Sequence, residues 1–431
     1  MYIVGGLMAF VGPSHCIIFH LHRRRLIQYN QSMSSSNLPE ILTRGVAQVL
    51  PSAQSLAALM SERPIKLYLG IDPTGSLLTL GHSVVLRKLQ QFAEAGHHVI
   101  LLIGNGTVRI GDPTGRDSTR PELTDEAITN NFQTWKEQAS TILDFTKIEI
   151  RYNGDWLDKL TYKDMVKLMA QTTVQQLLER DMFQDRLKQG LPIHGHEIMY
   201  PLLQGYDSVA MDVDLELGGT DQTFNMLMGR TLQKNFNNHE KWVLATPIIN
   251  GTDGRKMSKS YNNFIALTEE PESMYGKLMS IADEQIIEYF TLLTDTPLAE
   301  IEVMSQAIAA GDNPMQFKKQ LALTITTQYH TADKASQAQA FFERTVQSKQ
   351  APEELPIVTV PTQPASIISL LELCLPDQSK SALRRLVEQG AVEFMDTHDK
   401  PSDPLAEQTL KTERILRIGK RQYFKLVPTT F

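Results

Sequence analysis

Cysteine is scarce in this sequence, with Cys16 and Cys374 as the two cysteines among 431 residues. Neither lies in a CxxC pair or in a spacing typical of zinc ligands, so we expect neither a disulfide framework nor a structural metal site. The sequence also lacks a run of 18 apolar residues, so no membrane-spanning helix is predicted. These absences favour a reducing compartment, and we expect a cytoplasmic location.

Two common nucleotide-binding motifs are absent as well. The chain contains neither GxGxxG nor GxxxxGK[ST], so neither a dinucleotide-binding fingerprint nor a P-loop is supported. The formal net charge of -7 argues against a surface that coats nucleic acid broadly. It leaves RNA binding through local basic patches open.

What is present is a loop at residues 68–82 between two regular patterns. The apolar run Ile65–Leu69 predicts a buried strand, the spacing in Ser83–Gly96 predicts a helix, and Val99–Ile103 predicts a second strand. The loop therefore ends at a helix N-terminus, where backbone N–H groups and the helix dipole attract phosphate. A glycine-rich turn follows the second strand, and ligands of parallel α/β sheets bind at such strand ends.

These patterns predict an α/β protein with a Rossmann-like parallel sheet, followed by an α-helical domain and a small α+β domain. Helices are expected at Leu38–Leu50, Thr124–Leu143, Thr161–Leu178 and Pro314–Phe342, and the strand pattern resumes at Ser208–Leu217. The predicted organisation is a disordered extension (1–32), a catalytic domain (33–260) with a helical insertion at about 120–190, a helical domain (261–350), a linker (351–365) and a compact tail (366–431).

The most specific signal is the sequence Lys256-Met-Ser-Lys259-Ser260. Two lysines three residues apart in a Gly/Ser-rich loop can reach one polyphosphate and neutralise charge on a pyrophosphate leaving group. The alternative is an ordinary solvated basic turn. The combination with Gly81-His82, about 175 residues upstream, makes that alternative weak.

These two elements resemble the HIGH and KMSKS signatures of the class I aminoacyl-tRNA synthetases, which bind ATP from opposite sides. One position departs from the pattern, since Thr79 stands where the family has histidine. Threonine can still donate a hydrogen bond to a phosphate, but it cannot carry a positive charge.

A second set of residues concerns the amino acid. Tyr200, Gln204 and Asp207 are spaced i, i+4 and i+7, on one face of a helix. A phenol and a carboxylate, here Tyr68 and Asp207, suit the binding of a hydroxyl group, although Asp207 alone is as well explained by a structural ion pair. Together with Gly218-Gly-Thr-Asp-Gln222, the chain from about residue 38 onward resembles the bacterial type of tyrosyl-tRNA synthetase.

The resemblance implies a role for each matching residue. It implies that tyrosine is bound by Tyr68, Asp112, Tyr200, Gln204, Asp207 and Gln222. It implies that ATP and the adenylate are bound by Gly70, Asp72, Gly81, Gly219, Asp221, Ile248, Ile249 and Lys259. It implies catalytic contacts to the phosphates or ribose of ATP from Thr74, Thr79, His82, Arg116, Lys256 and Lys259.

The tail resembles an S4-type RNA-binding domain. Its basic helix, Ser379–Gln389, places three cations on adjacent turns, and two more follow near the C-terminus. RNA phosphates are the expected partners of such a face. The predicted RNA-binding residues are Lys380, Arg384, Arg385, Lys420 and Arg421.

The resemblance as a whole implies a tyrosine–tRNA ligase that uses ATP with Mg²⁺ on its phosphates. It implies tRNA(Tyr) and L-tyrosine as partners, and a homodimer with residues 120–190 at the interface. One alternative is a tryptophan enzyme of the same class, although tryptophan has no phenol for Tyr68 and Asp207 to bind. Another is a non-catalytic RNA-binding descendant, which the retained Lys256 and Lys259 argue against.

Overall fold

The computed structural model describes residues 38–114, 124–347, 355–419 and 422–429. The predictions for residues 1–32 and for Arg116, Lys420 and Arg421 therefore lie outside the described residues. Within the described part, no helix is both long and apolar enough to cross a membrane.

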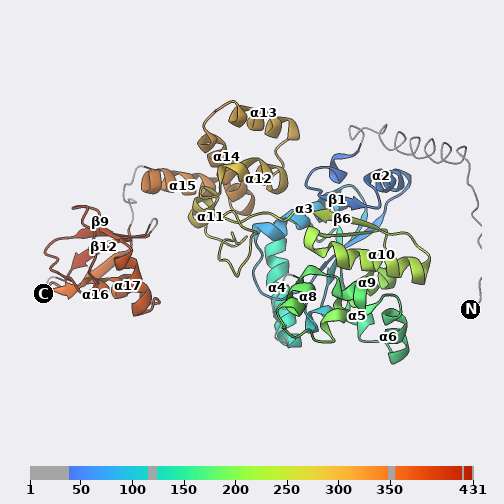
Figure 1. The fold of residues 1–431 in the computed structure, drawn as a ribbon. Coiled ribbons are helices and arrows are strands. Elements are labelled where there is room, and N and C mark those ends of the chain that lie inside the picture. The colour runs from blue at the N-terminus through green and yellow to red at the C-terminus, as the bar shows by residue number, and fades with distance from the viewer. Residues whose placement is uncertain (1–37, 115–123, 348–354, 420–421, 430–431) are drawn as a thin grey trace, which may run out of the picture. The chain divides into compact units, whose positions relative to one another are not determined.

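The chain divides into two compact units, each of which is described by itself (Figure 1). The first unit runs to Ser76 and continues from His82 to Ile248. The second unit contains the short segment Leu77–Gly81 and resumes at Ile249.

The first unit is built on a six-stranded sheet with the order β1-β6-β5-β2-β3-β4. Its strands are β1 (Gln48–Leu50), β2 (Lys66–Ile71), β3 (His98–Ile103), β4 (Ile148–Tyr152), β5 (Leu215–Gly219) and β6 (Trp242–Thr246). All neighbouring strands are parallel except β1, which runs antiparallel to β6. In the centre, Leu69 pairs with Leu101 on one side and with Leu217 on the other. The predicted parallel α/β sheet is thus confirmed.

The central strands are buried on both faces. Five consecutive residues of β3, from Val99 to Ile103, are buried, and so are Leu215–Gly218 of β5. Near-continuous apolar strands of this kind are typical of parallel sheets covered by helices. The larger helices of the unit are α2 (Ala53–Glu62), α3 (Leu80–Glu94), α4 (Asp125–Ala139), α9 (Tyr200–Met211) and α10 (Thr223–Asn237).

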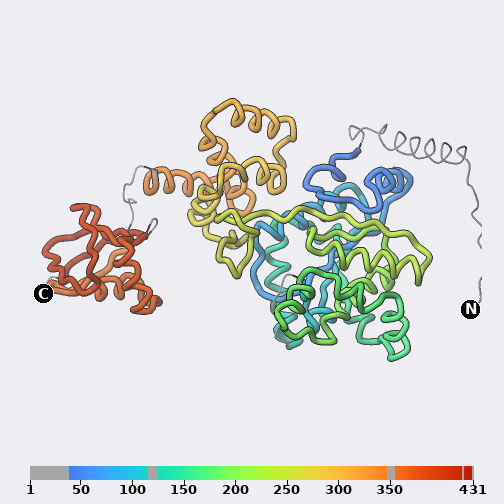
Figure 2. Tube along the Cα trace, viewed as in Figure 1, coloured from blue at the N-terminus to red at the C-terminus, as the bar shows by residue number. Residues whose placement is uncertain are grey.

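Four short helices gather at the end of the first unit opposite α2, as Figures 1 and 2 show. They are α5 (Gly154–Leu157), α6 (Tyr162–Met169), α7 (Val174–Leu178) and α8 (Asp181–Lys188). The single helix predicted for Thr161–Leu178 is therefore wrong. Thr173 caps a new helix with its side chain and makes a capping box with Gln176, which ends α6 and starts α7.

Three further local predictions are wrong. Residues 38–50 form the 3₁₀ turn η2 (Glu40–Leu42) and strand β1 instead of a helix, because Gly45 adopts a positive φ of 64° and β1 pairs with β6. The predicted helical insertion at 120–190 contains strand β4. The strand pattern at 208–217 begins too early, since α9 continues to Met211.

The second unit contains the helices α11 (Pro271–Leu278), α12 (Ile286–Leu293), α13 (Leu298–Ala309), α14 (Pro314–Tyr329) and α15 (Ala332–Phe342). The predicted helix at Pro314–Phe342 is in fact two helices. Thr331 caps α15 by accepting a hydrogen bond from the backbone N–H of Lys334, so the chain restarts a helix there.

The C-terminal part of the second unit has a four-stranded sheet with the order β7-β12-β11-β9. This part of the unit contains β7 (Ile357–Val360), β8 (Ala365–Ser366), α16 (Ile367–Cys374), α17 (Lys380–Glu388), β9 (Val392–Phe394), β10 (Glu407–Gln408), β11 (Arg414–Ile418) and β12 (Gln422–Pro428). Strands β8 and β10 pair with each other in a separate two-stranded sheet. Strand β7 lies in the segment predicted as a linker and pairs in parallel with β12. Helices α16 and α17 and the strands share an apolar core that includes Leu371, Leu383 and Phe394.

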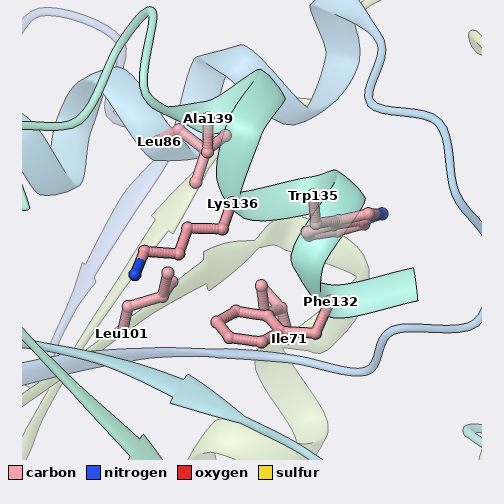
Figure 3. A pocket seen from close by; sticks show the side chains of 7 residues that line it. All are labelled: Ile71, Leu86, Leu101, Phe132, Trp135, Lys136 and Ala139. Carbon is pink, nitrogen blue, oxygen red and sulfur yellow. The ribbon is translucent and has the colours of Figure 1, made fainter. Parts of the chain in front are cut away.

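A small pocket in the first unit is mostly apolar (Figure 3). It is lined by Ile71, Leu86, Leu101, Phe132, Trp135, Lys136 and Ala139. The side chain of Lys136 extends past Leu101, and its amine lies 5.6 Å from the centre of the Phe145 ring. The pocket therefore lacks the converging polar groups that a catalytic site needs.

Candidate active site

The candidate site lies at the carboxyl ends of the parallel strands of the first unit. Strand β2 has β3 on one side and β5 on the other, although the chain passes from β2 to β3 and reaches β5 only later. This reversal of strand order is the place where open parallel sheets bind ligands. The predicted site residues of the first unit lie within or after these strands, at the start of α3, or on α9.

Tyr68 and Asp207 are both buried at this edge. The Tyr68 hydroxyl lies 3.0 Å from the Oγ of Ser208. The Asp207 carboxylate accepts hydrogen bonds from the Trp156 indole N–H at 2.8 Å and from the Asn153 amide at 3.2 Å. Burial raises the pKa of Tyr68 well above its usual value, and the nearby carboxylates of Glu216 and Asp207 add to this. The phenol and the carboxylate therefore lie close enough to interact electrostatically.

The pKa of Asp207 is also raised well above its usual range, chiefly by burial. The hydrogen bonds from Trp156 and Asn153 act in the opposite direction, and the charges of Glu216 and Asp72 raise the pKa further. A further hydrogen bond, from a ligand to this buried Asp207 carboxyl group, is therefore favourable.

Asp72, directly after β2, connects several elements of the site. Its Oδ1 accepts a hydrogen bond from the Thr107 hydroxyl at 2.8 Å, and its Oδ2 accepts one from the Tyr200 hydroxyl at 2.8 Å. Thr107 in turn accepts a hydrogen bond from Asn153 at 3.0 Å. Gly104 is required here, because a Cβ at that position would lie 1.9 Å from the Asp72 Oδ1.

Asp112 and Gln222, which are far apart in the sequence, are brought together. The Gln222 side-chain amide donates to the Asp112 Oδ2 at 2.8 Å. The Asp112 Oδ1 accepts from the backbone N–H and the hydroxyl of Thr114, and Arg180 donates to that hydroxyl at 2.6 Å. These contacts give one carboxylate at the edge of the sheet a fixed orientation.

At the end of β5 there is little room for a side chain on Gly219. A Cβ on Gly219 would lie 2.7 Å from the Asp221 Oδ1 and 3.9 Å from the Ile248 Cγ1. Gly219, Asp221 and Ile248, three residues predicted to bind ATP, are therefore neighbours. Gln204, predicted to bind the amino group, donates instead to the Glu216 Oε1 at 3.1 Å.

Helix α4 holds the loop after β2 by its backbone. Asn131, Trp135 and Gln138 donate side-chain hydrogen bonds to the carbonyls of Pro73, Gly75 and Ser76 at 3.0, 2.8 and 2.6 Å. His82 packs edge-on against the Trp135 ring, with 5.4 Å between ring centres. The loop that contains Thr74 is therefore supported by a helix that the sequence did not connect with it.

The second unit contains the lysine loop and most of the first signature. The backbone of Leu78 and Leu80 pairs with that of Leu267 and Ile265, at 3.0 Å in each case. Lys259 donates its ammonium to the carbonyl of Leu77 at 2.7 Å, and burial lowers the pKa of Lys259. A Cβ on Gly81 would lie 3.6 Å from the sulfur of Met257. The first signature and the lysine loop thus contact each other within this unit.

Asn263 binds the backbone of the lysine loop through its side chain. Its side-chain oxygen accepts from the Ser258 N–H at 2.8 Å. Its side-chain nitrogen faces the Asp253 Oδ1 at 2.7 Å and the carbonyls of Lys256 and Arg255 at 3.1 and 3.2 Å. The hydrogen bonds from Asn263 and Arg255 lower the pKa of Asp253 to about 2. One side chain that is 3% exposed therefore organises the backbone around both lysines.

The predicted basic residues of the tail lie on α17, and Lys380, Arg384 and Arg385 are all exposed. Lys380 makes an ion pair with Glu372 at 3.0 Å. Ser379 caps the helix and so fixes where this basic surface begins.

Several residues of the site were missed by sequence reasoning. Asn153 and Trp156 follow β4. Because that strand was not predicted, no site residue was expected at its carboxyl end. Ser208, Glu216 and Lys241 carry no motif, and their importance emerges only from their contacts. The adjacency of Ser208 to Asp207 was the one available signal.

The fold and this constellation define the class of the protein. The family model for tRNA synthetases class I (W and Y) matches residues 60–347. The chain belongs to this family, so the membership inferred from its two signatures is confirmed.

Curated relatives narrow the comparison further. The chain is 44% identical over 396 residues to a "Tyrosine--tRNA ligase" of Thermotoga maritima, covering 91% of this chain and 98% of the relative. It is also 44% identical over 403 residues to a protein of the same name from Symbiobacterium thermophilum, covering 92% of this chain and 98% of the relative. The resemblance to tyrosyl-tRNA synthetases is thereby confirmed over most of the chain.

Solved structures support the fold. A C-terminally truncated mitochondrial tyrosyl-tRNA synthetase of Coccidioides posadasii matches with a TM-score of 0.58 at 22% identity. The match covers 76% of this chain and 99% of that one. At this level of identity the similarity concerns the fold alone.

The contacts of Asn263 generate a prediction about the lysine loop. Replacing Asn263 by alanine removes the acceptor of the Ser258 N–H and the donor to the Lys256 carbonyl. We expect amide hydrogen exchange in peptides covering residues 252–260 to become at least about tenfold faster, since each lost hydrogen bond contributes about 1 kcal/mol. Mass spectrometry of the full-length variant measures this. Asn262→Gly is the matched control, because Asn262 is exposed with a φ of 52° that glycine also adopts. Equal exchange in wild type and Asn263→Ala would contradict the assignment.

Proposed function

We propose that the protein is a tyrosine–tRNA ligase. It activates L-tyrosine with ATP to give tyrosyl-adenylate and pyrophosphate, and then transfers tyrosine to the 3′ end of tRNA(Tyr) with release of AMP. The observation that carries the proposal is the buried pair of Tyr68 and Asp207 at the switch point of the sheet.

This pair suits a phenol ligand for a simple reason. A phenolic hydroxyl donates one hydrogen bond and accepts others, and Asp207 and Tyr68 offer a carboxylate and a second hydroxyl to match. A ligand that lacks the hydroxyl would cover these buried groups without supplying a hydrogen bond to either, which is unfavourable. The site therefore favours tyrosine over phenylalanine, and it offers tryptophan no matching group.

The remaining polar residues suit the amino acid's charged end. Asp112 and Tyr200 present a carboxylate and a hydroxyl, and Gln204 and Gln222 add side-chain amides. We infer that Asp112, Tyr200 and Gln204 bind the ammonium group and that Gln222 lies near the carboxylate. Because Gln222 and Gln204 have partners in the absence of ligand, binding exchanges those hydrogen bonds for new ones.

ATP is the second substrate. We infer that Gly219 and Asp221 hold the ribose, that Ile248 and Ile249 lie near adenine, and that Gly70 and Asp72 face the adenylate. Thr74, Thr79, Gly81 and His82 supply contacts to the phosphates and ribose, and Lys256, Lys259 and Arg116 would stabilise the pyrophosphate.

The chemistry requires no protein nucleophile. The tyrosine carboxylate itself attacks the α-phosphorus of ATP, and the bond to the pyrophosphate oxygen breaks as the new bond forms. The protein then contributes positioning and stabilisation of the charge that builds on pyrophosphate. Lys259 must leave the Leu77 carbonyl to serve in this way. Mg²⁺ would accompany the phosphates of ATP, since this ion prefers phosphate oxygens and water.

Two proposals concern RNA recognition by the rest of the molecule. The helical region 261–350 would recognise the anticodon, and the tail from residue 366 would bind RNA through Lys380, Arg384, Arg385, Lys420 and Arg421. The domain boundaries and the cytoplasmic location stay predictions.

We further propose a homodimer that uses residues 120–190. Its support is a set of exposed apolar side chains on and after α6–α8, among which Tyr162 is 82% exposed; the others are Val166, Met169, Val174, Leu187 and Leu191. Light scattering after size-exclusion chromatography should give twice the 48.5 kDa mass of the chain, and a monomer would contradict the proposal.

The decisive test of the function is ATP–pyrophosphate exchange. We expect exchange with tyrosine, and background exchange with tryptophan or with no amino acid, because only tyrosine has the phenol that Tyr68 and Asp207 match. Addition of excess EDTA should abolish the tyrosine signal. Exchange with tryptophan alone would indicate the tryptophan enzyme, and absence of all exchange would indicate a non-catalytic RNA-binding protein.

A truncation separates activation from tRNA charging. A chain that ends after residue 350 retains the site residues and the lysine loop but loses α17 and its cations. It should keep wild-type exchange with tyrosine and lose most of its charging of tRNA(Tyr), measured with radiolabelled tyrosine at the same enzyme concentration. Full charging by the truncated chain would refute the RNA-binding role of the tail.

A further inference from the structure

A continuous set of buried polar contacts runs behind the proposed tyrosine pocket. Tyr68 contacts Ser208, Ser208 contacts Lys241, Lys241 pairs with Glu216, and Glu216 accepts from Gln204. Tyr68, Ser208, Glu216 and Lys241 are each no more than 1% exposed. The set thus joins the residue that would read the phenol to one that would read the amino group.

Lys241 uses all of its donors within this set. Its ammonium donates to the Ser208 Oγ at 2.7 Å, to the Glu216 Oε2 and to the Met226 carbonyl at 3.1 Å. An ammonium has three N–H groups and no acceptor, so every one has a partner. Burial lowers the pKa of Lys241, and the carboxylate of Glu216 opposes that effect. A buried charge with complete pairing is a rigid element of a core.

The ammonium also settles the direction of the next hydrogen bond. Because Lys241 can only donate, the Ser208 oxygen must accept from it. The proton of the Ser208 hydroxyl then needs an acceptor, and the only one found among the described residues is the Tyr68 oxygen at 3.0 Å. A reversed bond would leave a buried hydroxyl proton without a partner, which is unfavourable.

This direction points the Tyr68 proton away from Ser208. Within the set its acceptor is Glu216, which raises the pKa of Tyr68 through its charge and a side-chain hydrogen bond and whose two oxygens also accept from Lys241 and Gln204. A ligand oxygen in the pocket can take over this hydrogen bond from Tyr68, while Asp207 accepts from the ligand hydroxyl.

The packing of α9 against α10 leaves room for the set. A Cβ on Gly229 of α10 would lie 2.4 Å from the Lys241 Nζ and 2.7 Å from the Ser208 Oγ. A Cβ on Gly205 of α9 would lie 3.0 Å from the Gly229 backbone nitrogen. These two glycines allow the helices to approach and the ammonium to reach Ser208.

We propose that Ser208, held by Lys241 and Glu216, is a positioning residue that sets the proton direction of Tyr68 and so contributes to the choice of tyrosine over phenylalanine. This inference rests on the proposed function and adds residues that act behind the pocket without touching the substrate.

The test compares Ser208→Ala with wild type in ATP–pyrophosphate exchange with tyrosine and with phenylalanine. We expect kcat/KM for tyrosine to fall about tenfold, mainly through KM, the size expected for one weakened hydrogen bond. The value for phenylalanine should stay unchanged, since phenylalanine has no oxygen for Tyr68 to bind. The ratio of the two values therefore falls about tenfold. Ser55→Ala is the matched control, because the Ser55 hydroxyl accepts from Trp242 away from the site.

A second variant guards against loss of folding. Lys241→Met combined with Glu216→Gln removes both buried charges together, so neither is left unpaired. It should lower the same ratio in a protein whose circular dichroism matches wild type. Equal losses for tyrosine and phenylalanine, or an unchanged ratio in both folded variants, would overturn the positioning role alone. Wild-type protein without tyrosine-dependent exchange would overturn the proposed function, and the positioning role with it.

Discussion

The carboxylate of Asp72 is the group on which the candidate site depends. Its two oxygens take hydrogen bonds from Thr107 after β3 and from Tyr200 on α9, and Thr107 in turn receives one from Asn153 after β4. One side chain at the end of β2 thereby aligns residues from three other elements. In a low-dielectric interior such bonds strengthen one another, and an unpaired member is correspondingly unfavourable. The cluster is therefore rigid before any ligand arrives.

The central sheet could be predicted because its strands are apolar without interruption. Val99–Ile103 has no polar residue, and the helix after residue 82 repeats its apolar positions at a regular spacing. Strand β4 was missed, although its apolar and charged residues alternate as in a half-buried strand, because the whole region 120–190 was interpreted as helical. Glu149 pairs with His98 of β3 and with Arg151 of its own strand.

Candidate residues could be named from the sequence where they stand in motifs, and they were missed where they act through the fold. Tyr68, Asp207 and the lysine loop belong to motifs that can be recognised in the sequence. Lys241 shows no such pattern, since its importance depends on the close approach of α9 and α10 at Gly205 and Gly229. The support of the 72–76 loop by α4 is equally invisible, because side chains there bind backbone carbonyls that every residue possesses.

The assignment of Leu77–Gly81 to the second unit has a consequence for synthesis on the ribosome. The sheet of the first unit is complete once β6 has been made, at Thr246. The backbone of Leu78 and Leu80, however, pairs with that of Leu267 and Ile265, which are made later. A nascent chain therefore holds every strand of this sheet about 20 residues before it holds the backbone partners of Leu78 and Leu80. The second unit, which contains Leu77–Gly81 and the lysine loop, is therefore completed after the sheet of the first unit.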